Sequence, residues 1–129
     1  MTRTAHLLIV DDEDIVLSLT KRGLERFGHR VTTFNSSIAA LKAFTDIPDS
    51  FDLIIADKNM PSMTGLELLS KMRVICDNIP VILFTGFIDS EQEEEIEETI
   101  HGIKILLKPL RMQALQEEIL DTLQAKSHK

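Results

Sequence analysis

Cysteine is almost absent from this 129-residue sequence, which contains only Cys76. A single cysteine cannot form an internal disulfide, and proteins without disulfides are usual in a reducing cytoplasm. The sequence also has no apolar run near the roughly 18 residues that a membrane-spanning helix needs. The longest apolar run near its start, Leu7–Val10, is too short for a secretory signal and is followed directly by acidic residues. We therefore expect a cytoplasmic protein without membrane insertion.

Basic residues are in deficit, because 14 Lys and Arg against 21 Asp and Glu give a formal net charge of −7. Nucleic-acid-binding domains usually carry a basic patch, so we expect no direct contact with nucleic acid. The four histidines, His6, His29, His101 and His128, show no zinc-ligand spacing, and we expect them at strand edges or on the surface. The strongest charge run, over residues 89–98, is acidic. It is typical of a solvated helix face, and the alternative is an acidic docking surface for a partner.

Internal repeats and low-complexity linkers are also absent. The length suits one compact domain, and the 43% of hydrophobic residues can build a core, so we expect a single domain over residues 1–129. Five short apolar runs recur along the chain. The first, third and fourth are almost continuous in apolar residues, as in strands of a parallel sheet that is covered on both faces. The runs are Leu7–Val10, Val31–Phe34, Leu53–Ala56, Val81–Phe84 and Ile103–Leu107.

Helical patterns follow the apolar runs. The predicted apolar faces are Ile15, Val16, Leu19, Gly23 and Phe27 in the first helix, Ile38, Leu41 and Phe44 in the second, and Leu115, Ile119 and Leu123 in the fifth, which runs from about Met112 to Leu123. The third helix opens with a capping box from Thr64 to Glu67. The fourth, acidic helix follows Asp89 or Ser90 and has only Ile96 and Ile100 to face the core. Five strands and five helices predict an α/β doubly wound fold, with a five-stranded parallel sheet in the flavodoxin-like order 2-1-3-4-5.

Acidic residues stand at the carboxyl ends of two predicted strands, the edge at which doubly wound sheets bind ligands. Asp11 and Asp12 follow the first strand, and Asp57 follows the third. Three carboxylates packed together repel one another unless a cation lies among them. Hard oxygen ligands without sulfur or imidazole favour Mg²⁺, with Mn²⁺ as an alternative.

A hydroxyl and an ammonium group are predicted at the same edge, because Thr85 ends the fourth strand and Lys108 the fifth. Thr85 can donate a hydrogen bond to a phosphoryl oxygen, and Lys108 supplies a positive charge for another. The backbone N–H groups of Lys58 and Gly86 are further candidate donors. Together these groups predict a metal-assisted phosphoryl site, in which a carboxylate between the metal and the lysine acts as a nucleophile. Taken singly, each of these residues is as readily a helix cap or a turn residue.

The sequence resembles the receiver domains of two-component signalling along essentially its whole length. The matching segments are Leu8–Glu13, Asp52–Pro61, Met63–Glu67, Pro80–Gly86 and Leu107–Pro109. The resemblance implies that Asp57 is the phosphoacceptor and that Asp12 binds the metal directly. Asp11 would assist through water, and the backbone carbonyl of Asn59 would be the third protein contact of the metal.

The resemblance also implies that Thr85 is the switch hydroxyl, that Lys108 pairs with the phosphoryl group, and that the Lys108–Pro109 bond is cis. The phosphoryl group would come from a histidine kinase or phosphotransfer protein. A downstream protein would bind the face of the fourth helix, fifth strand and fifth helix. The domain would be no ordinary enzyme, although it would catalyse its own phosphorylation and dephosphorylation. Ile105 departs from the aromatic residue usual at that position, so we expect the switch to use the 85–89 loop or the acidic helix.

Three other functions share parts of this pattern. A phosphohydrolase of the haloacid-dehalogenase type would need a second aspartate where Asn59 stands, and a flavodoxin-type carrier would need a first loop that does not repel phosphate as Asp11 and Asp12 do. A phosphorylation-independent scaffold remains open because of Ile105. We expect no output domain after the fifth helix, and the chain is either a single-domain regulator or a piece of a hybrid histidine kinase.

Overall fold

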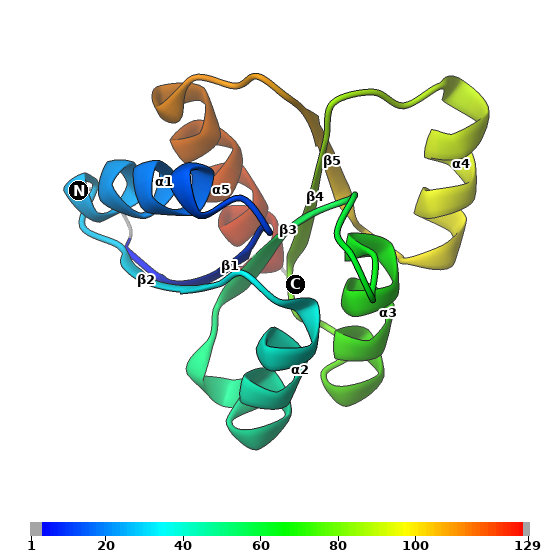
Figure 1. Ribbon diagram of the computed structural model, residues 1–129, viewed down its shortest axis with the longest axis horizontal. Helices are drawn as coiled ribbons and strands as arrows, with labels where there is room; N and C mark the ends of the chain where they lie inside the picture. The colour runs from blue at the N-terminus through cyan, green and yellow to red at the C-terminus, as the bar shows by residue number, and fades with distance from the viewer. Residues whose placement is uncertain (1–3, 128–129) are drawn as a thin grey trace.

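The computed structural model describes residues 4–127, which form a five-stranded parallel sheet between two layers of helices (Figure 1). The strands are β1 (His6–Val10), β2 (Arg30–Phe34), β3 (Leu53–Asp57), β4 (Val81–Thr85) and β5 (Lys104–Leu107). They lie in the order β2-β1-β3-β4-β5, and every neighbouring pair is parallel. The predicted fold class and strand order are therefore confirmed.

The helices are α1 (Asp14–Arg26), α2 (Ser37–Asp46), α3 (Gly65–Ile75), α4 (Ser90–Thr99) and α5 (Met112–Ser127), with a short 3₁₀ helix, η1 (Pro48–Ser50). Helices α1 and α5 cover one face of the sheet, and α2, α3 and α4 cover the other (Figure 1). Within the part of the chain that the structure describes, no helix is both long and apolar enough to span a bilayer.

The central strands are almost continuously apolar because both of their faces are covered. In β1, Leu7 and Ile9 pack in the core beneath α1 and α5, whereas Leu8 and Val10 pack in the core beneath α2, α3 and α4. All five residues of β3 are buried. This explains why the sequence shows continuous apolar runs rather than an alternating pattern.

The predicted apolar face of α1 is wrong at Ile15 and Leu19, whereas Val16, Gly23 and Phe27 are half-buried. Ile15 is 77% exposed and Leu19 is 59% exposed, while Leu17 and Leu24 turn inward. In α2, Ile38 is likewise exposed, and the expected Phe44 is buried. Two apolar rows at helical spacing run along α1, and the sequence does not distinguish them. The row that becomes buried depends on the rotation of the helix about its axis. That rotation is set by how the helix packs on the sheet.

The expected inward residues of α4 and α5 are buried as predicted, namely Ile96, Ile100, Leu115, Ile119 and Leu123. Of the histidines expected at strand edges or on the surface, His128 lies outside the described residues, and His29 directly precedes β2 but is buried, at 4% exposed. Its Nδ1 accepts a hydrogen bond from the Ala5 N–H at 3.1 Å, so its Nε2–H donates to Gln116 Oε1 at 2.6 Å. His29 therefore connects the turn before β2 to α5, and these distant partners make a buried histidine tolerable.

Local signals fix the helix ends well. The Thr64 hydroxyl accepts a hydrogen bond from the Glu67 N–H, and the Glu67 carboxylate accepts one from the Thr64 N–H, so the predicted capping box is confirmed. Asp89 caps α4 in the same reciprocal way with Gln92. Gly28, with φ +94°, follows the end of α1 in a backbone conformation that side chains disfavour.

Gly65 begins α3 against the end of β3. A Cβ atom there would lie 2.0 Å from the backbone carbonyl oxygen of Asp57. Replacing glycine by alanine in a helix usually gains about 1 kcal/mol. We expect the clash to outweigh this gain, because the opposing atom is backbone and cannot swing away. Gly65→Ala should lower the free energy of unfolding by about 1–3 kcal/mol.

Gly86→Ala is the matched control, because a Cβ there would meet nothing within 4 Å. It should change the stability by less than about 0.5 kcal/mol. Urea unfolding followed by circular dichroism suits the measurement, since the chain has no Trp and no Tyr. Equal stabilities of the two variants would contradict the close approach of α3 to β3.

Candidate functional site

The predicted functional residues gather at the carboxyl edge of the sheet. Asp11 and Asp12 follow β1, Asp57 ends β3, Thr85 ends β4, and Lys108 follows β5. These four strands are neighbours and parallel, so their carboxyl ends lie along one edge. Side chains that are far apart in the sequence are thereby brought into contact.

Three carboxylates form the centre of the site. Asp11, Asp12 and Asp57 each offer an oxygen, and these oxygens lie within 4.8 Å of one another. Asp11 is 5% exposed and Asp57 is 9% exposed, whereas Asp12 is exposed at the rim. The cluster is therefore buried on one side and open to solvent on the other.

Lys108 bridges the two buried carboxylates. Its Nζ lies 2.5 Å from Asp57 Oδ1 and 3.3 Å from Asp11 Oδ2. The remaining oxygens of both carboxylates accept backbone hydrogen bonds, from Glu13 N–H at 2.9 Å and from Asn59 N–H at 3.2 Å. The peptide bond between Lys108 and Pro109 is cis, as the resemblance implied.

The surroundings of this cluster disfavour the negative charge on its carboxylates. Burial raises the pKa of Asp57 above its usual value, and the charge of Asp11 raises it further, while Lys108 opposes both effects. For Lys108, burial alone would lower the pKa, but Asp57 and Asp11 outweigh burial and raise it. The ammonium group therefore stays charged, and the carboxylates have more negative charge between them than one lysine balances.

Thr85 is almost fully buried, at 1% exposed, but its hydroxyl is turned to its own loop. It donates a hydrogen bond to the Phe87 carbonyl oxygen at 2.9 Å and accepts one from the Phe87 N–H at 3.3 Å. The predicted switch residue thus lies at the expected edge, with its hydroxyl engaged away from Asp57.

The predicted donor role of the Lys58 backbone N–H is wrong. That group donates to the Phe84 carbonyl oxygen at 2.7 Å, because the pairing of β3 with β4 continues one residue beyond the strand. The N–H that points to the carboxylate of Asp57 belongs to Asn59. Sequence alone does not show where a strand pairing ends, so the predicted donor is one residue too early in the chain.

The loop that carries Asn59 is held by a residue that the sequence analysis did not single out. Ser37, at the start of α2, is 3% exposed and donates a hydrogen bond to the Met63 carbonyl oxygen at 2.8 Å. The Gly65 N–H bonds to the Lys58 carbonyl oxygen at 3.0 Å and closes the loop on itself. The only signal for Ser37 was its place in the Asn-Ser-Ser sequence before α2, which is equally explained by capping.

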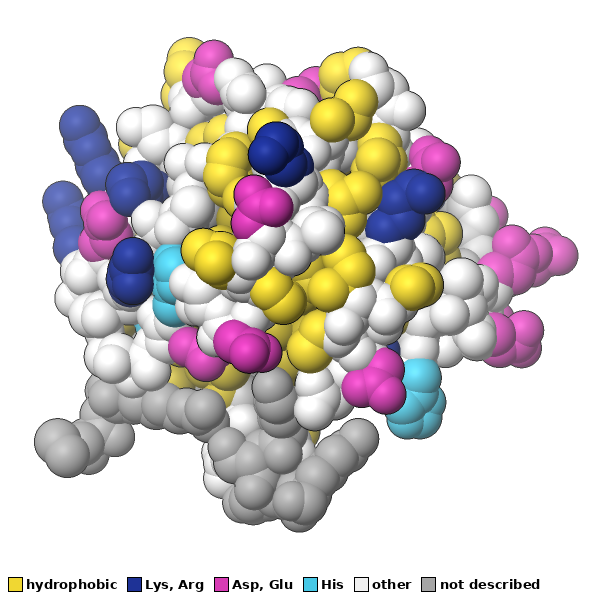
Figure 2. Space-filling view, turned by 90° about the horizontal axis from the view of Figure 1, so that it is seen from below, with side chains coloured by type: hydrophobic (Ala, Val, Ile, Leu, Met, Phe, Trp, Pro, Cys, Tyr) yellow, Lys and Arg dark blue, Asp and Glu magenta, His cyan; other side chains and the backbone are white. Residues whose placement is uncertain are grey.

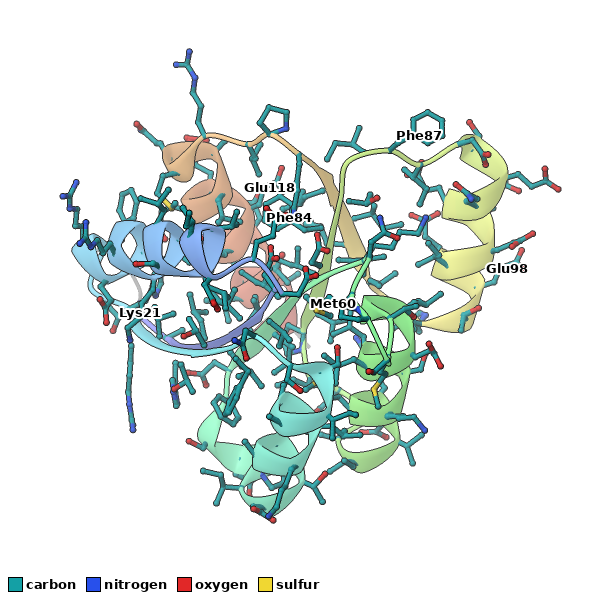
Figure 3. All side chains as sticks on the ribbon, viewed as in Figure 1. Lys21, Met60, Phe84, Phe87, Glu98 and Glu118 are labelled. Carbon is teal, nitrogen blue, oxygen red and sulfur yellow. The ribbon has the colours of Figure 1, made fainter. Side chains whose placement is uncertain are left out.

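A cavity of about 300 Å³ adjoins the carboxylates between α1 and α5. Asp11, Asp57 and Lys108 contribute to its wall, together with the aliphatic side chains of Leu17 and Leu115. Figure 3 labels Phe84, which also lines the cavity, and Met60, which lies in the loop after β3. The charged end of this cavity is continuous with the carboxylate cluster.

The donor set fits a hard divalent cation. Mg²⁺ binds oxygens at 2.0–2.1 Å, so opposite ligands stand about 4.2 Å apart. The three carboxylate oxygens lie within 4.8 Å of one another, a spacing compatible with contact to one such ion. The cluster contains no nitrogen or sulfur donor that would favour zinc.

Comparisons with known proteins agree with this geometry. The family model of the response regulator receiver domain matches residues 7–120. The two-component response regulator ORR22 of Oryza sativa subsp. indica is 35% identical over 112 residues, which are 86% of this chain and 16% of that relative. The chain therefore corresponds to a small part of the length of this relative.

Solved structures of receiver domains superpose closely on the fold. A response regulator receiver domain protein from Clostridium thermocellum has a TM-score of 0.85 and 31% identity, with 96% of this chain and 98% of that chain covered. The receiver domain of the hybrid histidine kinase CckA has a TM-score of 0.77 and 29% identity, with 92% and 98% covered. The chain belongs to the family of response regulator receiver domains, the phosphorelay modules of two-component signalling.

Proposed function

We propose that this receiver domain takes a phosphoryl group on Asp57 from a histidine kinase or phosphotransfer protein, with Mg²⁺ as cofactor. The observation that supports this most directly is the position of the Asp57 carboxylate. It contacts the ammonium group of Lys108 and belongs to one cluster with the carboxylates of Asp11 and Asp12. A nucleophile in this place has a fixed positive charge and a cation site next to the phosphorus that it would attack.

Four residues are proposed to hold the metal. Asp12 would be the direct ligand, with Asp11 acting through water, and Asp57 and the backbone carbonyl of Asn59 would complete the protein contacts. Mg²⁺ usually keeps several waters, which leaves a position for a phosphoryl oxygen. When bound, it supplies positive charge that the carboxylate cluster lacks and neutralises charge on the transferring group. Mn²⁺ prefers the same oxygen donors and is proposed as a substitute.

In the proposed transfer, an oxygen of the Asp57 carboxylate attacks the phosphorus of a phosphohistidine. The phosphorus–nitrogen bond breaks, and the imidazole leaves with the electron pair of that bond. The product is an acyl phosphate on Asp57. Lys108 already contacts Asp57, so its ammonium group would follow the negative charge onto a phosphoryl oxygen. The Asn59 N–H is a second donor close to that position.

The structure supports a specific output switch. The Thr85 hydroxyl has one proton, which it donates to the Phe87 carbonyl oxygen. To donate to a phosphoryl oxygen instead, it would have to release Phe87. We propose that this release frees the loop between β4 and α4 and changes the face formed by α4, β5 and α5, where a downstream protein would bind. Ile105 is partly buried against the core, and its β-branched side chain is stiff, so it need not move.

Incubation with acetyl phosphate and Mg²⁺ should add one phosphoryl group to the intact protein, measured by mass spectrometry. The adduct should be lost on treatment with base, since acyl phosphates are labile there. Asp57→Asn should show no adduct, because its amide oxygen is a poor nucleophile. EDTA should abolish the reaction, and Asp12→Asn should slow it by at least about tenfold, which corresponds to a barrier raised by roughly 1.4 kcal/mol.

Asp14→Asn is the matched control for the Asp12 variant, since Asp14 is also exposed and lies outside the cluster, bonded to Asn35. It should be phosphorylated at the wild-type rate. Equal labelling of Asp57→Asn and wild type would show that the acceptor is misassigned. No labelling of the wild type by any phosphodonor would favour the phosphorylation-independent scaffold.

The charge imbalance predicts a pH-dependent stability difference. An acid whose pKa is higher in the folded than in the unfolded state stabilises folding while it is protonated. For Asp57 this contribution should be lost as the pH rises from 3.8 through its raised pKa. In EDTA, Asp57→Asn should therefore be more stable than wild type at pH 7, and the difference should shrink toward pH 4.

Mg²⁺ should reduce this difference in stability between Asp57→Asn and the wild type. At about ten times its dissociation constant, it should stabilise the wild type by roughly 1.4 kcal/mol and the Asp57→Asn variant by less. Thermal unfolding followed by circular dichroism at several pH values measures both effects. A wild type that is more stable than the variant in EDTA throughout this pH range would refute the proposed imbalance.

Beryllofluoride, a phosphoryl mimic, should increase amide hydrogen exchange in residues 87–101, because the Thr85 hydroxyl leaves Phe87. Thr85→Val removes the hydroxyl and keeps the shape of the side chain. It should show faster exchange at residues 86–89 before beryllofluoride is added, and little further change afterwards. The switch proposal fails if the wild type changes only at residues around Asp57 and Lys108.

A further inference from the structure

Helix α4 stands apart from the other helices at one side of the molecule (Figure 1). Ile96 is its only buried residue, and Ile100 follows at its end. Figure 3 shows Glu98 pointing away from the sheet, and Phe87 on the loop that leads into the helix. Most of the surface of α4 is therefore available to a partner.

The exposed surface of α4 is strongly acidic. It carries six exposed glutamates, Glu91, Glu93, Glu94, Glu95, Glu97 and Glu98, and no basic residue. Across residues 4–127, no ion pair involves any of these carboxylates. Several lie three or four positions apart, where like charges repel one another, and no basic residue in the last turn offsets the helix dipole. A cationic partner would relieve this repulsion.

Exposed apolar side chains adjoin the acidic helix. Phe87 is 74% exposed and Leu107 is 53% exposed. The strand register pairs Leu107 with Thr85, and Phe87 follows two residues later. Between them, a Cβ atom on Gly86 would meet no other atom within 4 Å. An apolar strip from β5 to the start of α4 thus borders the glutamates.

We propose that this surface, made of Phe87, Leu107 and the exposed glutamates of α4, binds a basic amphipathic segment of a partner protein. Apolar side chains of the segment would cover Phe87 and Leu107, and its lysines or arginines would face the glutamates. The inference rests on the proposed use of α4, β5 and α5 as the output face, and it adds the chemistry of the partner. Release of Phe87 by Thr85 would alter the apolar part of the surface and leave its charge unchanged.

Other kinds of partner match the negative charge of this surface less well. Nucleic acid and anionic membranes carry the same sign as α4 and would be repelled. A two-fold pair of copies that joined through this surface would place glutamates against glutamates. Figure 2 shows acidic side chains projecting at the edge of the molecule on the α4 side. A basic protein segment is the partner whose charge and apolar groups both match.

The test uses the full-length chain and a fluorescent synthetic helix of leucine and lysine at amphipathic spacing. The same peptide with glutamate in place of every lysine is the second probe. Fluorescence anisotropy should show binding of the lysine peptide only. Glu94→Lys/Glu98→Lys should weaken that binding by about tenfold or more, and Phe87→Ser should weaken it as well.

Asp46→Lys/Asp49→Lys is the matched control, because both positions are exposed at the end of α2 and in η1. Each pair of substitutions removes two negative charges and adds two positive ones, so the net charge changes from −7 to −3. A general attraction to an acidic protein would be weakened equally by both variants, and this result would overturn the proposal. Amide NMR shifts on binding should fall on residues 87–100 and 105–107. Shifts confined to Asp11 and Asp12 would overturn it too.

Three further results would count against a basic partner segment. These are equal binding of the glutamate peptide, binding to vesicles of anionic phospholipid, and self-association that Glu94→Lys/Glu98→Lys abolishes. The output proposal is tested separately by the response of residues 87–101 to beryllofluoride. If that response is present and the lysine peptide does not bind, the output face stands and the basic-partner inference fails.

Discussion

The contact of Lys108 with two buried carboxylates is the interaction on which the site depends. Its ammonium group lies between Asp57 and Asp11, 97 positions from the latter along the chain. Without it, two carboxylates shielded from solvent would face each other, and at least one would tend to take up a proton. One lysine leaves the cluster short of positive charge, which is why a divalent cation suits the open side at Asp12.

The parallel sheet supplies the geometry that this contact needs. Its central strands are covered on both faces, so the carboxyl edge is the place where polar groups can gather without disturbing the core. Close packing makes the edge rigid. Gly65 approaches the backbone of Asp57 so tightly that a methyl group has no room, and Ser37 fixes the loop that carries Asn59.

The link from this site to the surface runs through a short chain of contacts. Thr85 is buried beside the site, yet both of its hydroxyl hydrogen bonds go to Phe87, which is exposed. A hydroxyl with a single proton cannot serve the phosphoryl group and the Phe87 carbonyl oxygen together. This competition connects the proposed chemistry at Asp57 to α4, a helix with one buried residue and therefore little to hold it in place.

Sequence by itself determined the strand order, the helix caps and the convergence of Asp11, Asp12, Asp57, Thr85 and Lys108, because apolar runs, capping residues and strand ends are local signals. Tertiary structure alone decided which apolar row of α1 is buried, that His29 lies inside, and that Asn59 rather than Lys58 points its N–H at the Asp57 carboxylate. It also decided the direction of the Thr85 hydroxyl. Each of these depends on how helices are seated or how far strand pairing extends, and those positions are set by groups distant in the chain.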